Sequence, residues 1–600
     1  RPADIGGTKK GAAMSQTARL NAGQRASRKV IEILAPFGAK DRIKSSGALW
    51  NPQRKVWYLE WSALGARSMA RELENAGYGV QCDDQVSSLL RGAADRDTAI
   101  AEREPDYSSV LAPRPYQRLA VRMILRMSGC VLAWDMGTGK TKAVIDAVLA
   151  SRETADPMRR VLVVAPKSVV GVWSREADKH WPAAIEHELV TLPLDRGTVA
   201  KRRELLRRAL VAQSEQQHKH TLIVAINYEA AIAGKMAELL AETDWDLAIA
   251  DESHRLMNHA SKTAKFMSDK IRPRARRRVC LTGTPIANHP GDLFGQLKFA
   301  DPGVFGTSWW NFKSRWLRTQ DHPFPKIHGI EPDRSREFQA RLDLVMHRVR
   351  VDDVLDLHDA IDERIEVELS KDTRKIYVGL RDELVAQVEA GEITVSNAMV
   401  KMLRLQQVAN GVGVVAAEDP RDNRTYDIGS EKLDATSELI QGIDRSHAVV
   451  IFAQFRRDIE RLHAMATAIG REPYVLRGGL DQHQQWRDSA EIQQGPVLIV
   501  QRRAGGVGID LTASRYCINY SGTFSSVDWR QSRARQRRHG QRHAVIYYHL
   551  IARDTVDDHI MRALERKQSQ SDDILERRDN GGADIAAGVM ASMTEAPQTA

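Results

Sequence analysis

Two series of short apolar runs, rich in valine and isoleucine, recur along this 600-residue chain and are separated by segments with helical patterns. The first series comprises residues 130–133, 161–165, 222–226, 247–250 and 279–281, and the second comprises residues 448–452, 497–500, 516–520 and 545–550. Unbroken apolar strands that alternate with helices are typical of parallel sheets with helices on both faces. The sequence therefore predicts an α/β protein with two such lobes.

The first run ends in a glycine-rich break, Met-Gly-Thr-Gly-Lys-Thr, after which a helical pattern resumes. A strand that stops near Gly137 and Gly139 and restarts as a helix leaves backbone N–H groups and a helix N-terminus facing outward, where anions bind. Lys140 adds a positive charge and Thr141 a hydroxyl. Because Trp134 stands where the pattern G-x-x-x-x-G-K-[ST] has its first glycine, the match is incomplete. The break predicts a site for a nucleoside triphosphate with Mg²⁺.

Polar side chains also follow two other predicted strands. Asp251 and Glu252 come directly after a buried run. One carboxylate there can hold the water shell of Mg²⁺, and its neighbour can orient and deprotonate an attacking water. The turn that contains Thr282 and Thr284 follows another run, and we expect it to lie near these carboxylates.

The second lobe contains an arginine-rich segment, residues 528–541. Arg535 and Arg538 are three residues apart and would share one face if the segment is helical. An arginine donated across a cleft accelerates phosphoryl transfer by about 10³- to 10⁵-fold. The alternative is a basic helix that only binds the phosphate backbone of a nucleic acid.

Positive charge is concentrated at two places in a chain whose net charge is +10. Residues 1–60 hold twelve Lys and Arg against four Asp and Glu, and residues 501–543 hold nine Arg against two Asp. Such patches favour a polyanionic partner, although each could also be a solvated basic face. No apolar run approaches the roughly 18 residues that a membrane helix needs, and no C-x-x-C pair occurs. We therefore expect a cytoplasmic protein without a membrane partner.

Nine segments between about residues 111 and 565 extend these observations: PRPYQ, WDMGTGKT, VLVVAPKSVVGVWSREADKHWP, DESHRLMNHASKT, LTGTPIANHPGDLFGQL, LRLQQVANG, VVIFAQF, AGGVGIDLT and QSRARQRRHGQ. In this order they resemble the motifs of the Swi/Snf-type (sucrose-nonfermenting) branch of helicase superfamily two, whose motors move along double-stranded DNA. The resemblance implies two RecA-like lobes and a DNA-dependent ATPase that uses ATP and Mg²⁺.

The resemblance also implies a role for each matching residue. It makes Gln117 the reader of the adenine edge, Thr141 and Asp251 the magnesium site, and Glu252 the catalytic base. Arg535 and Arg538 become arginine fingers. The other nucleotide contacts would be Gly137, Thr138, Gly139, Lys140, Gly508 and Asp510. The contacts to DNA or to the interlobe cleft would be Pro166, Lys167, Thr284, Gly506 and Thr512. Trp134, Met257 and Asp510 depart from the family pattern without removing a phosphate or metal contact.

The segment before the first lobe has a different character. Trp50 and Trp57 flank an Asn-Pro turn with Arg54 and Lys55, and a short helical pattern follows. This indicates a small α+β module built on a hairpin and a helix. Its pattern K-x-x-G-A-x-W-x-P-x-x-K-x-W resembles the accessory domain of the HepA-related (HARP) subgroup, which recognises branched DNA. These four side chains are therefore candidate DNA contacts, although both tryptophans could instead fill a small core.

The expected divisions are a basic flexible tail (1–28), the accessory module (29–86), a linker (87–104), the ATP-binding lobe (105–300), helical insertions with the interlobe connection (301–430), the second lobe (431–565) and a flexible C-terminal tail (566–600). The sequence favours a double-stranded DNA translocase of bacterial or phage type, associated with the nucleoid, that moves on or remodels duplex or branched DNA. Two alternatives remain open: a strand-separating DNA or RNA helicase, and a non-catalytic scaffold that binds DNA or RNA polymerase.

Overall fold

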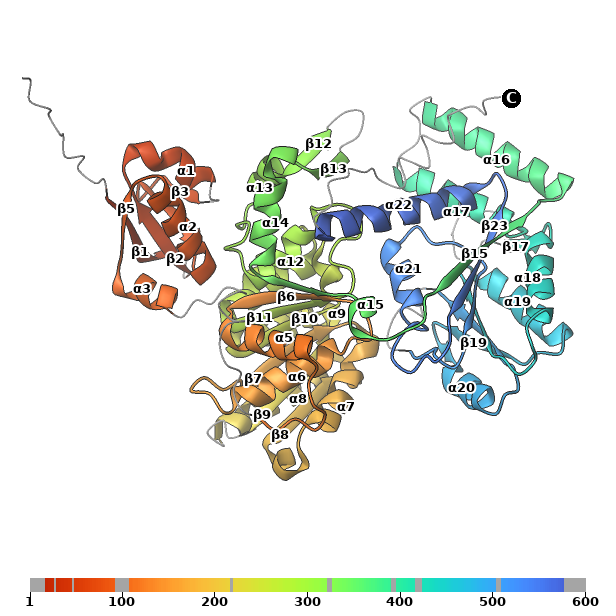
Figure 1. Cartoon of the computed structure of the whole chain (residues 1–600), viewed down its shortest axis with the longest axis horizontal. Coiled ribbons are helices and arrows are strands. Elements are labelled where there is room, and N and C mark those ends of the chain that lie inside the picture. The colour runs from red at the N-terminus through yellow and green to blue at the C-terminus, as the bar shows by residue number, and fades with distance from the viewer. Residues whose placement is uncertain are drawn as a thin grey trace, which may run out of the picture.

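The computed structural model of the chain describes residues 17–25, 28–45, 48–91, 107–215, 220–320, 326–389, 395–415, 424–502 and 509–576. Within these ranges it forms an N-terminal module and two larger lobes (Figure 1). Each lobe contains a seven-stranded sheet. The expected α/β architecture with two parallel-sheet lobes is confirmed.

The N-terminal module, residues 17–91, is a five-stranded sheet of order β3-β4-β2-β1-β5 packed against helices. Its strands are β1 (Thr17–Arg25), β2 (Arg28–Leu34), β3 (Leu49–Asn51), β4 (Val56–Glu60) and β5 (Gly79–Cys82). Its helices are α1 (Lys40–Ser45), α2 (Ala63–Asn75) and α3 (Asp84–Arg91). The predicted hairpin is β3 and β4, which pair antiparallel before α2.

The expected boundary of a flexible tail at residue 28 is wrong for residues 17–25. These residues form β1, which pairs with β2 through residues 19–25 and with β5 through residues 17–20. Ala18 and Leu20 are fully buried in the module core, whereas Thr17 and Arg19 are exposed. This alternation holds β1 in the sheet, because one face of the strand is apolar.

Lobe 1, residues 107–349, is built on an all-parallel sheet of order β14-β6-β11-β10-β7-β9-β8. The strands are β6 (Gly129–Trp134), β7 (Arg160–Ala165), β8 (Leu189–Leu194), β9 (Thr221–Asn227), β10 (Trp245–Asp251), β11 (Ala275–Thr282) and β14 (Met346–Val349). The helices include α5 (Pro115–Arg126), α6 (Lys140–Ser151), α7 (Val170–His180), α8 (Val199–Glu215), α9 (Tyr228–Ala231), α10 (Gly234–Glu242), α11 (Lys262–Phe266) and α12 (Asp292–Ala300). All five runs of the first series lie in these strands.

Residues 301–345 add α13 (Trp309–Trp316), α14 (Ser335–Asp343) and a hairpin of β12 (Leu317–Gln320) and β13 (Lys326–Ile330) to lobe 1. The chain then returns to the lobe 1 sheet in β14 and crosses to lobe 2 through residues 350–360, here called the hinge. The hinge contains α15 (Val351–Val354). The predicted insertion segment 301–430 thus contributes one strand to each large sheet.

Lobe 2, residues 361–576, has a sheet of order β15-β23-β22-β18-β21-β19-β20, which is parallel except for β20. The strands are β15 (Ile361–Val367), β18 (Val449–Ala453), β19 (Pro473–Arg477), β20 (Leu480–Asp481), β21 (Val497–Gln501), β22 (Tyr516–Asn519) and β23 (Ile546–Ala552), beside a small hairpin of β16 (Val412–Val415) and β17 (Arg424–Asp427). The helices are α16 (Lys371–Glu389), α17 (Val395–Ala409), α18 (Glu431–Gln441), α19 (Arg456–Ala468), α20 (His483–Glu491), α21 (Ser526–Arg533) and α22 (Val556–Glu576).

Helix α22 runs from lobe 2 back to lobe 1 (Figure 1). Asp572 forms an ion pair with Arg348 of lobe 1 at 2.8 Å, and Ile574 and Leu575 pack against the lobe 1 core. The predicted flexible tail from residue 566 is therefore wrong as far as Glu576, because an apolar face and an ion pair hold this end of the helix. Residues 577–600 lie outside the described residues, as do residues 1–16 and most of the expected linker.

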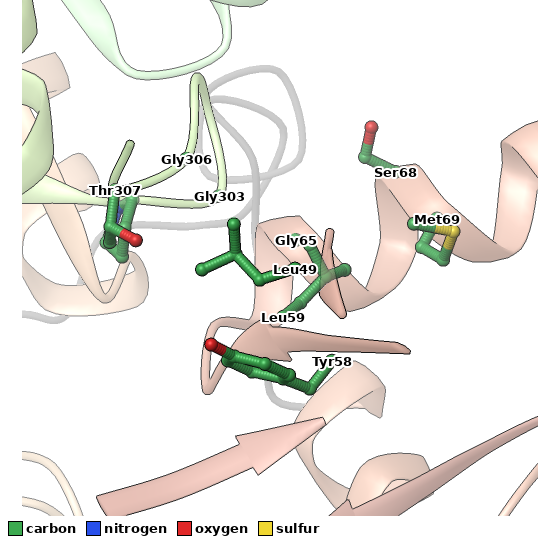
Figure 2. A pocket seen from close by; sticks show the side chains of 10 residues that line it. Leu49, Tyr58, Leu59, Gly65, Ser68, Met69, Gly303, Gly306 and Thr307 are labelled. Atoms are coloured by element: carbon green, nitrogen blue, oxygen red, sulfur yellow. The ribbon is translucent and has the colours of Figure 1, made fainter. Parts of the chain in front are cut away.

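The module is attached to lobe 1 through buried hydrogen bonds. Ser62 caps α2 by accepting from the Gly65 N–H and also donates to Asp301 at 2.7 Å. The other oxygen of Asp301 accepts from Ser128, the residue before β6, also at 2.7 Å. Beside these bonds, the backbones of Gly65 and Gly303 are in contact and line a small pocket between module and lobe (Figure 2). Asp301 thus links the module to the start of the strand that carries the glycine-rich loop.

None of the helices in the described part of the chain has the length and apolar character needed to cross a membrane.

Candidate active site

The glycine-rich loop leads from β6, whose residues are all buried, into α6. Gly137 and Gly139 have φ values of 81° and 83°, which glycine adopts without strain. The Lys140 amine donates to the carbonyls of Trp134 and Asp135 at 2.8 and 3.1 Å and so lies over the loop. Burial lowers the pKa of Lys140, although the charges of Glu252 and Asp251 act in the opposite direction.

Trp134 replaces a glycine of the motif without disturbing the loop. It is the last residue of β6 and fully buried, and its indole N–H donates to His347 of β14 at 3.2 Å. Its ring meets the Tyr116 ring edge-on at 5.0 Å. The departure from the motif therefore falls on a core position of the strand.

Helix α5 holds the loop from the other side. Gln117 accepts from the Arg114 N–H at 2.9 Å and donates to the Thr138 carbonyl at 3.3 Å. The Tyr116 hydroxyl donates to the same carbonyl at 2.8 Å. Gly139 has φ 83°, and a Cβ there would lie 2.5 Å from the Gln117 amide nitrogen, so another residue would be strained and would displace Gln117. Gln117 thus contacts the loop, and its contact with adenine stays a prediction.

The acidic pair stands at the end of β10, beside β11 and β7 in the sheet. Asp251 accepts from the Trp173 indole at 2.8 Å and from the Glu252 N–H at 2.9 Å. Burial and the neighbouring Glu252 charge raise the pKa of Asp251 to about 6. Trp173 lies within the motif VLVVAPKSVVGVWSREADKHWP, but no local pattern assigns it a role at the site.

Glu252 has the left-handed conformation, with φ 51°, which is strained for a residue other than glycine. Its carboxylate lies 3.2 Å from the His254 imidazole. Burial acts to raise its pKa, but the hydrogen bond to His254 and the charges of His254, Lys140 and Arg535 outweigh this and lower it. The carboxylate is therefore ionised, as a group that accepts a proton must be.

Thr282 and Thr284 follow β11, in which Leu281 pairs with Asp251 of β10, and the turn that contains them also lies close to the glycine-rich loop. Both are buried, and the Thr284 N–H donates to the Thr282 hydroxyl at 3.0 Å. A Cβ on Gly283 between them would lie 3.3 Å from the Met136 side chain. The turn after β11 therefore packs against the first residues of the glycine-rich loop.

Arg535 and Arg538 of lobe 2 reach the lobe 1 site. A Cβ on Gly137 would lie 3.2 Å from the Cβ of Arg538, so the two lobes are in contact there. Arg535 is 7 % exposed and interacts electrostatically with Glu252 and Lys140. Burial lowers the pKa of Arg535 to about 10, and the Glu252 charge opposes this. The structure thus brings the predicted base, lysine and arginines together.

The lobe 2 loop before these arginines is only partly described. Gly506 and Gly508 lie outside the described residues. Asp510 accepts from the Thr512 N–H and hydroxyl at 3.1 and 2.8 Å, and Arg538 donates to the Ile509 carbonyl at 3.5 Å. Asp510 and Thr512 therefore border the Arg538 side of the site.

The remaining predicted DNA contacts are exposed to different degrees. In lobe 1, Lys167 is exposed, whereas Pro166 is buried. In the module, Trp50 is 46 % exposed and Trp57 is partly buried against the module core, with their ring centroids 5.2 Å apart. The exposure of Trp50 is compatible with a DNA contact, whereas the packing of Trp57 is that of a core residue.

Arg54 and Lys55 occupy the turn between β3 and β4. Arg54 pairs with Glu32 at 2.5 Å, while its side chain remains 54 % exposed. Lys55 is exposed and has φ 53°. The turn therefore presents two cations to solvent beside Trp50.

Thr141 and Asp251 fit a magnesium site by their chemistry, because hydroxyl and carboxylate oxygens are the ligands this ion prefers. Among the described residues, no three His, Cys, Asp or Glu side chains gather into a metal-binding group. A site with one carboxylate, a hydroxyl, phosphate oxygens and water is typical of Mg²⁺ with a nucleotide.

A cavity of about 590 Å³ lies between the lobes next to this site. It is lined by Asp135, Met136 and the turn 283–285 of lobe 1, by hinge residues, and by α21 and α22. Its walls include Arg530 of the arginine-rich segment and two arginines outside every predicted motif, Arg348 and Arg350. The hinge and the arginine-rich segment thus line the same cavity.

Comparisons with known proteins agree with this arrangement. Residues 58–414 match the SNF2-related domain family, and residues 431–540 match the helicase conserved C-terminal domain family. The DNA repair and recombination protein Rdh54 of Saccharomyces cerevisiae (strain JAY291) is 24% identical over 493 residues, which cover 75% of this chain and 51% of Rdh54. The chain thus spans about half the length of that relative.

Protein p41 of the Acyrthosiphon pisum secondary endosymbiont phage 1 is 25% identical over 481 residues, which cover 77% of this chain and 98% of p41. Among solved structures, the SWI2/SNF2 ATPase core of Sulfolobus solfataricus in complex with double-stranded DNA is 21% identical, with a TM-score of 0.36. That match covers 82% of this chain and 97% of the other.

Proposed function

Because the chain belongs to the SNF2-related family, we propose that it is a DNA-dependent ATPase that moves along double-stranded DNA. The observation that carries this proposal is the contact of Arg538 with Gly137, together with the interaction of Arg535 with Glu252. A nucleotide site with walls from two lobes couples hydrolysis to lobe movement, since the site is complete only when the lobes are closed.

Each side chain then has a defined task. Lys140 and the N–H groups of the glycine-rich loop bind the phosphates, and Glu252 orients and deprotonates the attacking water. Arg535 and Arg538 stabilise the negative charge that develops on the transferred phosphoryl group. Thr141 and Asp251 would hold Mg²⁺, which supplies charge neutralisation on the phosphates when bound.

DNA is the proposed track because this chain is basic and because Rdh54 is named for DNA repair and recombination. Contacts to phosphates carry no sequence information, so movement would be indifferent to sequence and sensitive to salt. Lys167, Thr284 and Thr512, with Pro166 and Gly506, are the proposed contacts of the lobes. Trp50, Arg54, Lys55 and Trp57 would give the module a preference for branched DNA. The proposal includes a cytoplasmic, nucleoid-associated location.

The test is ATP hydrolysis with and without duplex DNA. We expect DNA to stimulate the wild-type rate and Lys140→Ala or Glu252→Gln to abolish it. Lys179→Ala and Glu242→Gln change exposed residues of the same types and serve as controls with wild-type rates. An absence of stimulation by DNA, or full activity in the two site variants, would refute the proposal.

Two further assays separate this proposal from its alternatives. A translocase displaces a third strand from a DNA triplex without unwinding the duplex, whereas a strand-separating helicase also unwinds it. A non-catalytic scaffold would bind DNA without any single-turnover hydrolysis. The presence of Lys140, Asp251, Glu252, Arg535 and Arg538 in one site argues against the scaffold.

A further inference from the structure

The arginine-rich segment, which includes the end of α21, faces in two directions. Arg535 and Arg538 face the glycine-rich loop and the acidic pair. Arg533 and Arg537, which alternate with them, instead line the interlobe cavity and contact carboxylates at and just after the hinge. One short segment thus joins the nucleotide site to the connection between the lobes.

Arg537 makes three contacts with the hinge. Its guanidinium pairs with Asp352 of α15, donates from Nε to the His358 carbonyl at 3.1 Å and lies 3.7 Å from Asp359. The Arg537 side chain is only 17% exposed, although Asp352 is 57% exposed. A guanidinium presents several donors in a rigid fork, so these contacts fix its orientation.

The hinge is itself attached to lobe 1 next to the nucleotide site. The Val351 N–H donates to the carboxylate of Asp135, in the glycine-rich loop, at 2.9 Å. The Val354 carbonyl accepts from Arg114 at 2.8 Å, and Arg114 also donates its N–H to Gln117. Helix α15 therefore has a fixed position relative to the loop that would hold the phosphates.

Arg533 fixes the other end of the segment within lobe 2. It forms a two-point ion pair with Asp362 of β15, one bond of which is 2.8 Å, and lies over the Tyr547 ring at 4.0 Å. Asp362 also contacts His549 at 2.8 Å. The Leu511 N–H also donates to the Arg535 carbonyl at 3.1 Å. The segment is therefore part of lobe 2, and its approach to the hinge follows the closure of the lobes.

Resting on the proposed function, we propose that Arg537 is a positioning residue, which sets Arg535 and Arg538 against the nucleotide by binding Asp352 when the lobes close. Because the pair is partly exposed, it contributes little to stability, and its effect is on the position of the segment. Misplacement of a catalytic group by about 1 Å lowers a rate by about 100-fold.

The experiment is a charge swap between Arg537 and Asp352. We expect Arg537→Asp and Asp352→Arg each to lower kcat by about 10- to 100-fold, with KM for ATP changed less than about twofold. The double variant, which restores the pair with opposite charges, should recover kcat to within about threefold of wild type. Asp353→Arg makes the same charge change at the next exposed residue, which forms no ion pair within the described ranges, and should leave kcat unchanged.

Three outcomes would overturn the inference: wild-type kcat in Arg537→Ala, no recovery in the folded double variant, or a loss confined to thermal stability. The failure of the proposed function is a separate result, because it would appear in the wild type as a rate that DNA does not stimulate. In that case, the ATPase rates of the Arg537 and Asp352 variants without DNA, compared with the wild-type rate without DNA, still test the role of Arg537.

Discussion

Gly137 of lobe 1 and Arg538 of lobe 2 lie so close that a Cβ on the glycine would meet the arginine Cβ at 3.2 Å. They are 401 positions apart in the sequence. Gly137 belongs to the glycine-rich loop and Arg538 to the arginine-rich segment, and the two-lobed nucleotide site needs both. The contact shows that the structure is closed across the nucleotide site. It also explains why a small residue is needed at Gly137 beyond the φ of 81°.

Gly137→Ala should lower the ATPase rate by at least about tenfold, because the methyl group strains the loop and holds Arg538 away. Gly197→Ala is the matched control, since Gly197 has φ 80° but its Cβ would meet only Lys201 at 3.8 Å. In both variants the alanine must adopt the left-handed conformation, which lowers the free energy of unfolding by about 1 kcal/mol, as thermal unfolding would measure. Equal rates in the two variants would show that the lobe contact has no effect on hydrolysis.

Trp50→Ala and Trp57→Ala should separate DNA binding from module stability. Trp50 is 46 % exposed, and the loss of a base-stacking surface costs about 1–3 kcal/mol, so we expect binding to forked DNA to weaken at least fivefold without a change in Tm. Trp57 packs on the module core, and its removal should lower stability by about 1–3 kcal/mol. Fluorescence anisotropy and thermal melting measure the two effects. Unaltered fork binding in Trp50→Ala would contradict the assignment.

Ser62→Ala should loosen the module from lobe 1. It removes the cap of α2, worth about 1 kcal/mol, and the hydrogen bond to Asp301. Hydrogen exchange should speed up in residues 63–75 while β6 stays protected. Ser68→Ala, on the same helix beside the pocket shown in Figure 2, is the control and should leave exchange unchanged. Identical exchange in the two variants would show that the Asp301 bond does not hold the module.

Asp458 should make the stability of lobe 2 depend on pH. Its carboxylate is buried between Asn410, Ser521 and the charged Lys432, and burial raises its pKa to about 7. Between about pH 4 and 7 the folded state therefore retains a proton that the unfolded state has lost. The free energy of unfolding falls as pH rises through this range, by about 1.4 kcal/mol per unit of pKa difference.

Asp458→Asn removes this titration. Relative to wild type, the variant should gain stability as pH rises from 5 to 8, which calorimetry would record as Tm curves that diverge by a few degrees. The exposed Asp353→Asn should leave the wild-type slope unchanged. Parallel curves for wild type and Asp458→Asn would show that this carboxylate does not titrate in the range.

The sequence by itself determined nine of the fourteen strands in the two large sheets and the residue types of the nucleotide site. Apolar runs and the glycine-rich break are local patterns, and local periodicity is sufficient to indicate a buried strand or a helix start. The same kind of pattern was present in β1, where Ala18 and Leu20 alternate with polar residues, but a basic composition concealed it. The extension of α22 to Glu576 was missed for a different reason, since its support comes from Arg348, far away in the chain.

Only the tertiary structure decided which distant residues meet. Ser62 and Asp301 are separated by 239 positions, and Arg537 and Asp352 by 185, so no pattern within a short window relates them. Trp173 and Asp251, which form a hydrogen bond, are likewise far apart, at 78 positions. Such contacts depend on the order of strands in the sheets and on the path of the hinge, which bring separate segments to one edge. Local sequence chemistry thus set what each segment can do, and packing set which segments act together.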